Sequence, residues 1–94
     1  MERGFYVLAY DISCDKRRAK VAKLLESTGN RVQGSVFEAW FTQNELERVV
    51  IRSQKILLEK EDSLRIYFIC EECRAKIQMK GTGKVTEKPG LVIV

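Results

Sequence analysis

The chain has 94 residues, of which 45% are hydrophobic and 32% charged, with a formal charge of +4 and a pI near 9.1. This composition predicts one globular domain, excludes disordered and fibrous proteins, and favours a polyanionic partner. Because no apolar run approaches the ~18 residues that cross a bilayer and the start of the chain lacks a signal-peptide pattern, we expect a cytoplasmic protein without membrane contact.

The first predicted element is a strand over residues 4–12, since Phe5 to Tyr10 is an unbroken run of apolar and aromatic strand formers. Alternation places Phe5, Val7, Ala9 and Asp11 on one face and Tyr6, Leu8 and Tyr10 on the other. Both faces are apolar, so both should be covered. The strand ends in Asp11, whose charge is costly to bury unless it is paired or faces an open site.

Asp11 is a candidate metal ligand. Histidine is absent from the chain, which excludes histidine-type zinc sites and Ser-His triads and leaves carboxylates, hydroxyls, thiols, lysine or a hard metal ion for any catalysis. One carboxylate cannot hold a catalytic Mg²⁺ alone, but a two-fold axis close to Asp11 would supply a second copy. Alternatively, Asp11 caps a turn by accepting hydrogen bonds from N–H groups near Ser13 and Asp15.

A helix is predicted from Asp15, as its N-cap, to Gly29, which ends it. Apolar residues recur at helical spacing and are expected to face the core: Val21, Leu24, Leu25 and Thr28. A group of bases, called the basic cluster below, could converge beside Asp11: Lys16, Arg17, Arg18, Lys20 and, on the following strand, Arg31. These residues could contact the phosphates of a nucleic acid; the alternative is a solvated helix face.

Residues 30–41 predict a β-hairpin in which Gly34 takes the positive φ of a type II′ turn before a strand over Val36 to Phe41. Thr42 to Glu45 has the pattern of a capping box, which predicts the start of a second helix. That helix should end near Leu58, before a solvated charge run over residues 59–62.

A fourth strand is predicted over residues 63–70, followed by a turn of helix over residues 71–76. The last four residues, 91–94, are a fifth strand candidate that could pair with a sheet edge of its own or of a partner subunit. These observations divide the chain into a domain over residues 1–80 and a tail over residues 81–94.

The chain contains three cysteines, Cys14, Cys70 and Cys73, and this odd number argues against a disulfide framework. The C-x-x-C pair Cys70 and Cys73 is only half of a zinc site, and a redox motif would need to open a helix after a strand in a thioredoxin-like setting. We expect a pair of small residues at a strand end. The alternatives are a zinc ion shared across a dimer and a stabilising disulfide.

The order β-α-β-β-α-β with a tail strand predicts an α+β, ferredoxin-like fold. Two helices of this length can cover one face of a four-stranded antiparallel sheet. The second face would carry part of a large apolar set, consisting of Tyr6, Leu8, Tyr10, Tyr67 and Ile69. Because this is too much apolar surface for a monomer, we predict a homodimer packed sheet on sheet.

Three segments together resemble the Cas2 family of CRISPR-associated proteins. They are Tyr10 to Ser13 with the helix over Asp15 to Leu25, then Gly29 to Glu38, and finally Asp62 to Tyr67. The resemblance implies a ferredoxin-like homodimer in which Asp11 and its dimer mate coordinate a metal ion. It also implies which residues line that site: Tyr10, Arg18, Arg31, Ser35 and Phe37.

Members of this family have been described as Mg²⁺-dependent endonucleases on single-stranded RNA or double-stranded DNA. They also form the central part of the spacer-acquisition complex of antiviral defence, where they bridge two dimers of the CRISPR integrase. Two hypotheses follow. In the first, paired Asp11 residues bind Mg²⁺ while Arg18 and Arg31 hold the scissile phosphate. In the second, the dimer is a scaffold that binds duplex DNA, its C-terminal strand docks the integrase, and Asp11 is structural.

Overall fold

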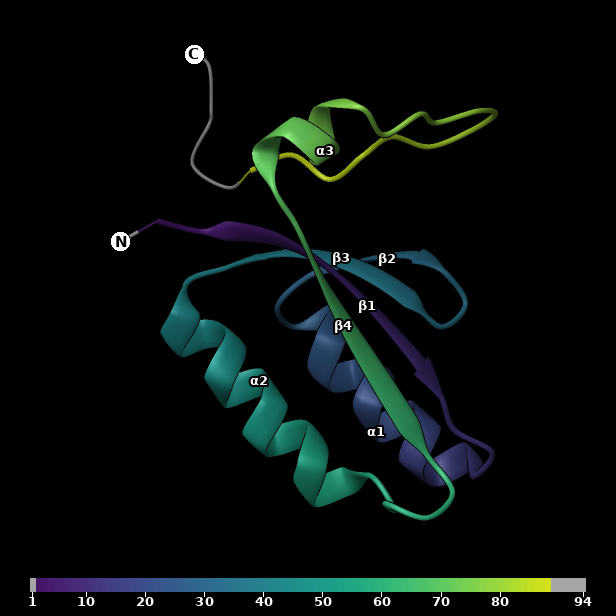
Figure 1. Cartoon of the computed structure of the whole chain (residues 1–94). Coiled ribbons are helices and arrows are strands. Elements are labelled where there is room, and N and C mark those ends of the chain that lie inside the picture. Colours follow the sequence, from purple (N-terminus) through teal and green to yellow (C-terminus); the bar gives the residue numbers. More distant parts are fainter. Residues whose placement is uncertain (1, 89–94) are drawn as a thin grey trace.

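The computed structural model describes residues 2–88, which form an α+β fold with one antiparallel sheet (Figure 1). The elements are β1 (Gly4–Asp11), α1 (Asp15–Glu26), β2 (Asn30–Gln33), β3 (Val36–Phe41), α2 (Gln43–Ile56), β4 (Ser63–Ile69) and α3 (Glu71–Ala75). The strand order in the sheet is β2-β3-β1-β4, and α1 and α2 lie together on one face of it. The predicted ferredoxin-like fold is confirmed.

The register of β1 decides which of its side chains the helices cover. Leu8 lies opposite Phe37 of β3 and Ile66 of β4, and all three contribute to the core under α1 and α2. Tyr6 and Tyr10 point to the same side as Leu8 and also contribute to this core. Of the apolar set that was expected to lie partly on the second face, Tyr67 and Ile69 lie there, whereas the three β1 residues lie on the covered face. Because both faces of β1 are apolar, alternation alone could not choose between them.

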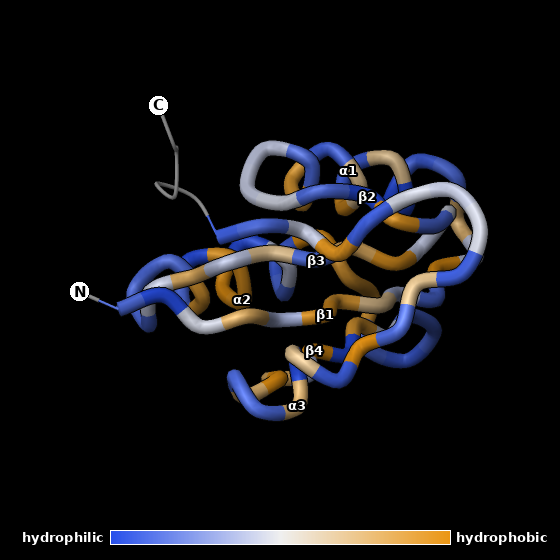
Figure 2. The backbone as a smooth tube through the Cα atoms, turned by 90° about the horizontal axis from the view of Figure 1, so that it is seen from above, coloured by the Kyte–Doolittle hydropathy of each residue, from blue (hydrophilic) through white to orange (hydrophobic). Residues whose placement is uncertain are grey.

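The core lies between the sheet and the two long helices. Its most deeply buried members there are Leu8, Val21, Leu25 and Phe37, with Val49 of α2 beside them. Along α1 and β4, hydrophobic residues are interspersed with hydrophilic ones (Figure 2), as expected for elements with one buried side.

The predicted hairpin forms, but its turn differs from the predicted one. Gly34 lies between β2 and β3 and does not have a positive φ, so the turn is not of type II′. Instead, the pairing of the two strands shifts between Arg31 and Gln33. Such an irregularity increases the local twist of a strand pair, which a II′ turn would otherwise have supplied.

The start of α2 follows its capping signal, whereas both ends of α1 differ from the predicted ones. Thr42 Oγ1 accepts a hydrogen bond from the Glu45 N–H (3.2 Å), and Glu45 Oε1 accepts one from the Thr42 N–H (2.8 Å), which confirms the capping box of α2. Cys14 is the N-cap of α1, one residue earlier than predicted. Gly29 has no positive φ; a Cβ there would lie 2.8 Å from the Glu38 carbonyl oxygen, so glycine allows a close approach to β3.

The face of the sheet turned away from α1 and α2 is called the open face below. It carries Val7 and Ala9 of β1, which lie opposite Tyr67 and Arg65 of β4. Tyr67 is 47% exposed. Residues of the helix layer cannot reach this side, so an apolar and aromatic surface remains on it.

The segment after α3 closes on one end of the open face, around Trp40. The Thr86 N–H donates to Glu38 Oε1 (2.9 Å), and Trp40 Nε1 donates to the Thr86 carbonyl oxygen (3.1 Å). Arg74 and Lys88 both lie over the Trp40 ring, at 5.1 and 5.7 Å from its centre. Both cations are within the range of cation–π attraction, so a single indole ring anchors α3 and the following segment.

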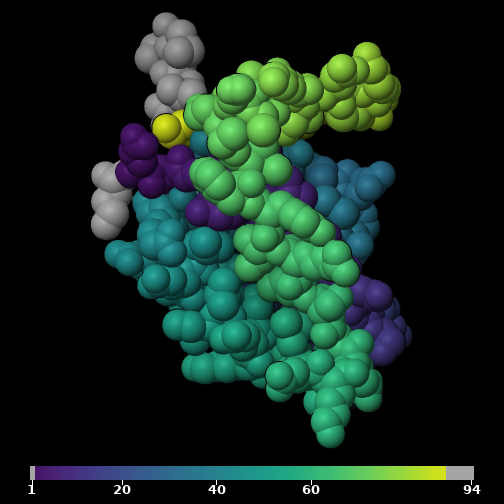
Figure 3. All heavy atoms as spheres, viewed as in Figure 1, coloured from purple at the N-terminus to yellow at the C-terminus, as the bar shows by residue number. Residues whose placement is uncertain are grey.

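The loop between α3 and residue 86 projects away from the sheet and helices (Figure 3). The predicted strand over residues 91–94 lies outside the described residues, and the boundary between residues 80 and 81 stays a prediction. No helix among residues 2–88 has the length and apolar character to cross a membrane.

Candidate functional site

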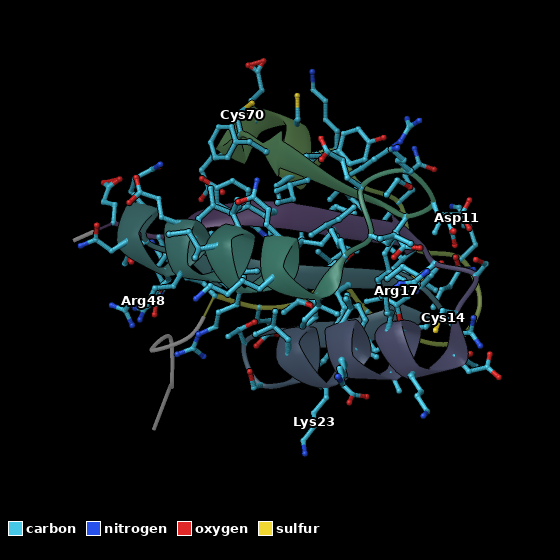
Figure 4. All side chains as sticks on the ribbon, turned by 90° about the horizontal axis from the view of Figure 1, so that it is seen from below. Asp11, Cys14, Arg17, Lys23, Arg48 and Cys70 are labelled. Atoms are coloured by element: carbon cyan, nitrogen blue, oxygen red, sulfur yellow. The ribbon has the colours of Figure 1, made fainter. Side chains whose placement is uncertain are left out.

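Asp11 ends β1 and lies opposite Ser63 of β4. By alternation from Val7 and Ala9 it belongs to the open face. Its side chain is exposed and forms no hydrogen bond or ion pair with any of residues 2–88. The turn-capping alternative is therefore not realised, and the carboxylate is available to a ligand. Figure 4 shows Asp11 at the end of the sheet from which the chain turns toward Cys14 and α1.

An open pocket of about 560 Å³ lies on the helix side of the sheet, between α1 and the β2–β3 hairpin. Its lining includes four of the predicted site residues, namely Tyr10, Arg18, Arg31 and Ser35. The buried ring of Phe37 contacts this group, because the Arg31 guanidinium lies 5.3 Å from its centre. The structure thus brings these residues together but leaves Asp11 outside, on the opposite face of β1.

Tyr10 and Arg31 shape the hairpin side of the pocket. The Tyr10 hydroxyl donates to the Gly34 carbonyl oxygen (3.3 Å), and the Tyr10 N–H donates to the Ser35 carbonyl oxygen (3.1 Å). Both bonds attach the hairpin turn to β1. Arg31 pairs with Glu26 of α1 (3.3 Å) while stacking on the ring below, which leaves other guanidinium donors facing the pocket.

Arg18 holds the backbone that follows Asp11. Its guanidinium donates to the carbonyl oxygen of Ile12 (2.8 Å) and to that of Ser13 (3.4 Å), and it also pairs with the Asp15 carboxylate. Ile12 is the residue next to Asp11 in the chain. Arg18 therefore fixes the position of the strand end that carries the candidate metal ligand.

Arg17 is directed to the loop before β4 rather than to Asp11. Its Nε lies 2.6 Å from Asp62 Oδ2 and its Nη2 lies 3.1 Å from Asp62 Oδ1, which is a bidentate pair. The Leu58 N–H also donates to Asp62 (2.9 Å). The Arg17 hydrogen bond lowers the pKa of Asp62 and, in return, raises the pKa of Arg17. Arg17, which was predicted to contact phosphate, is therefore engaged by Asp62 instead.

Asp62 is the structural residue that the sequence pattern missed. It belongs to the charge run over residues 59–62, which was predicted to be solvated, but its side chain is fully covered. No local signal distinguishes it, because its partner Arg17 lies 45 positions away in the chain.

The lysines of α1 form an exposed stripe. Lys16, Lys20 and Lys23 follow one another at helical spacing, and all three are exposed. None of them pairs with an acid among residues 2–88, and Lys23 points away from the sheet in Figure 4. Such a row of free ammonium groups suits the phosphates of a nucleic acid, because each contact is electrostatic and independent of base sequence.

A Mg²⁺ ion fits Asp11 in donor chemistry. Magnesium takes oxygen ligands, usually one or two carboxylates completed by water and phosphate, and Asp11 offers an exposed, unpaired carboxylate. Within residues 2–88, no three His, Cys, Asp or Glu side chains are grouped closely enough to hold a metal ion. One described chain therefore contributes one acidic ligand, and a second acid would have to come from a second copy.

Comparison with known proteins gives consistent matches. The sequence model of the family described as CRISPR associated protein Cas2 matches residues 4–77. A Synechocystis protein named CRISPR-associated endoribonuclease Cas2 3 is 43% identical over 89 residues, covering 95% of this chain and 97% of that protein. A Thermus thermophilus protein named CRISPR-associated endonuclease Cas2 2 is 39% identical, covering 93% of this chain and 92% of that protein.

Among solved structures, a chain of a partial Cas6-RT-Cas1–Cas2 complex superposes with a TM-score of 0.79 at 27% identity. The match covers 97% of this chain and 99% of that chain. Sequence and fold comparisons therefore agree over nearly the whole length of the protein.

Proposed function

This chain belongs to the Cas2 family of CRISPR-associated proteins, and we propose that it acts in spacer acquisition as a homodimeric, Mg²⁺-dependent endonuclease. Its substrates would be phosphodiesters of single-stranded RNA or double-stranded DNA in the cytoplasm. The relatives named endoribonuclease and endonuclease support nuclease activity. The solved complex that contains Cas1 and Cas2 supports a partnership with the CRISPR integrase.

The nuclease proposal rests mainly on the exposure of Asp11 and on its lack of a partner within the described part of the chain. Its carboxylate is exposed at the end of the central strand and has no partner among residues 2–88. A charge in this position serves no folding role that the described residues reveal. Two copies of the chain that meet through their open faces would bring two such carboxylates toward a common axis.

In the proposed mechanism, a Mg²⁺ ion bound between the two Asp11 carboxylates would supply Lewis-acid stabilisation of the phosphoryl oxygens. Arg18 keeps the Asp11 carboxylate in place by holding the carbonyl oxygens of Ile12 and Ser13. Arg31 offers its free guanidinium donors to a phosphate in the pocket, and Tyr10 and Ser35 hold the hairpin that carries it.

Arg31 and the exposed lysines of α1 are placed to bind the nucleic acid strand rather than to contact the phosphate that reacts. The pocket lies on the helix side of the sheet and Asp11 on the open face, so a nucleic acid would contact both by passing around the end of β1. We therefore assign strand positioning to Arg31, Lys16 and Lys20, and metal binding to Asp11.

A second candidate function is that of a scaffold without catalysis. The observation in its favour is that one described chain supplies one acidic ligand, while the exposed lysines of α1 suit duplex phosphates. In this case the dimer would bind duplex DNA and bridge integrase subunits, and Asp11 would contribute no chemistry.

Cleavage by wild type and by Asp11→Asn separates the two functions. Both proteins would be incubated with labelled single-stranded RNA and duplex DNA, with Mg²⁺ or with EDTA. We expect wild type to cut only with Mg²⁺ and Asp11→Asn to be at least about a hundredfold slower, since this range is typical for removal of a principal electrostatic group. Glu47→Ala, a change of an exposed acid on α2, is the matched control and should retain full activity.

Equal cleavage by wild type and Asp11→Asn would contradict the nuclease proposal and indicate a contaminating enzyme. If neither protein cuts while both bind duplex DNA, the scaffold function is supported instead. The substrate that is cut in the wild-type reactions identifies the protein as a ribonuclease or a deoxyribonuclease.

A further inference from the structure

Two of the three cysteines lie together after β4 and take part in neither proposed function. Cys70 is the N-cap of α3, and Cys73 lies in its first turn. Both are free thiols and both are exposed. The C-x-x-C pair therefore opens a helix directly after a strand, as a redox motif does, but in a ferredoxin-like rather than a thioredoxin-like fold.

Cys70 and Cys73 lie three residues apart at the start of α3. Residues three apart at a helix start have Cβ atoms about 5–6 Å apart, which lets one turn bring two thiols into contact. The backbone N–H of Cys73 and the neighbouring Cys73 thiol favour the charged form of Cys70 and lower the pKa of its thiol. The same thiol–thiol contact raises the pKa of Cys73. One member is thus favoured as the thiolate and the other as the thiol.

A packing role does not account for this pair. Cysteines that only fill space behave as small hydrophobic groups and are usually buried, whereas Cys70 and Cys73 are exposed and α3 has no buried residue. Reactive cysteines, by contrast, combine exposure with a stabilised thiolate. The prediction of two small residues at a strand end describes their location but not these properties.

We propose that Cys70 and Cys73 form a reversible dithiol–disulfide pair that exchanges with small-molecule disulfides such as oxidised glutathione. The Cys70 thiolate attacks one sulfur of the small disulfide, which expels one thiolate and leaves a mixed disulfide on Cys70. Cys73 then loses its proton and attacks the Cys70 sulfur, which expels the second thiolate. The protein loses two electrons and two protons in total, and the small disulfide is reduced to two thiols.

The bond would constrain the helix that touches Trp40. Arg74 of α3 pairs with Glu71 (2.9 Å) and lies over the Trp40 ring, while Lys88 lies over the same ring. A disulfide across the first turn fixes the start of α3 and, with it, the position of Arg74. The redox state of the pair is thereby linked to the segment that closes on the open face.

The test counts free thiols in the folded protein after equilibration with mixtures of reduced and oxidised glutathione. Wild type, with three cysteines, should change from three alkylated residues to one in a single two-electron step, with a mass decrease of about 2 Da before alkylation. Cys14→Ser should change from two alkylated residues to none. Cys70→Ser and Cys73→Ser should never form the internal bond.

A second measurement tests the assigned roles of the two thiols. In reduced wild type at neutral pH, iodoacetamide should alkylate Cys70 at least several-fold faster than Cys73, as mapped by peptide mass, because thiolate is the reacting form. Equal rates would overturn the assignment of Cys70 as the attacking residue.

Three free thiols in oxidised wild type would overturn the proposal. So would a protein that forms only mixed disulfides or cross-linked pairs of chains, without the internal bond. None of these measurements depends on nuclease activity, so their outcome is separate from that of the Asp11 experiment.

Discussion

Arg17 and Arg18 are neighbours in the chain, yet their guanidinium groups hold different parts of the backbone. Arg17 binds Asp62 and so joins the start of α1 to the loop before β4. Arg18 binds the carbonyl oxygens that follow Asp11. At the scale of single residues, these two arginines position the site, while Lys16 and Lys20 remain free of ion pairs within residues 2–88.

Replacing Asp62 with asparagine should change how stability depends on pH. The pKa of Asp62 is lowered in the folded protein by Arg17, so its charge stabilises the fold above the unfolded pKa, and this stabilisation is lost as pH falls through the lowered folded pKa. We expect Asp62→Asn to melt at a lower temperature than wild type at pH 7. The two melting temperatures should converge as pH falls through the lowered folded pKa of Asp62, where the wild-type carboxyl becomes protonated.

Thermal melts followed by circular dichroism between about pH 2 and pH 8 would measure this difference. Glu59→Gln, an exposed change in the same loop, is the control and should follow wild type throughout. A constant gap between Asp62→Asn and wild type at every pH would show that the ion pair is not the source of the effect.

At the scale of the elements, α1 has two distinct sides. Val21 and Leu25 are buried against the sheet, whereas Lys16, Lys20 and Lys23 are exposed on the other side. The buried side packs the helix against the sheet. The exposed lysines form a positively charged surface that makes no ion pair within residues 2–88.

Lysine-to-alanine changes on α1 should weaken binding of duplex DNA equally for all base sequences. Removing one ammonium group from a phosphate should reduce the slope of log K against log salt by about one, so Lys16→Ala and Lys20→Ala should each flatten it by that amount. Lys80→Ala lies outside the basic cluster and serves as the control. Fluorescence anisotropy over a salt series measures the slopes, and unchanged slopes in both α1 variants would place the binding surface elsewhere.

The order of the elements could be predicted from sequence because its signals are local. The capping box at Thr42 and the strand period around Ile66 lie within a few residues and need no distant partner. The face of β1 that the helices cover could not be predicted, since Leu8 and Val7 are both apolar. The turn at Gly34 was also mispredicted, because a shift in strand pairing replaced the special φ that glycine permits.

Only part of the candidate site could be predicted from the sequence, because some of its contacts join residues that are far apart in the chain. A pattern of adjacent charges indicated the basic cluster, and family resemblance indicated Tyr10, Arg18, Arg31 and Ser35, which the structure brings to one pocket. These residues and Asp11 lie on opposite faces of the sheet. This arrangement follows from the strand register and the topology, which local patterns do not reveal. The covered position of Asp62 depends on a pairing across 45 residues, which one sequence does not encode visibly.

At the scale of the whole molecule, the open face is the side of the sheet that neither α1 nor α2 covers. Tyr67 is 47% exposed beside Val7 and Ala9, and the helices lie on the opposite side of the sheet. Sheet-on-sheet packing of two copies would cover this surface and bring the Asp11 side chains to the same interface.

A charge placed on the open face should therefore prevent dimer formation. We expect wild type to have about twice the chain mass of 10.9 kDa and Tyr67→Asp to have the mass of one chain, because an unpaired carboxylate in an apolar interface is strongly unfavourable. Ile51→Asp, a change of a 53% exposed residue on α2, is the matched control and should stay dimeric. Light scattering after size exclusion gives these masses, and a dimeric Tyr67→Asp protein would rule out this interface.

Trp40 is the single tryptophan of the chain. Its ring is contacted by two cations, and its Nε1 is hydrogen-bonded to the segment that closes on the sheet. Indole emission responds to nearby charge, hydrogen bonding and water, so the colour and intensity of the fluorescence report whether that segment is in place. The protein therefore contains a built-in optical probe, without any added label, at the junction between α3 and the sheet.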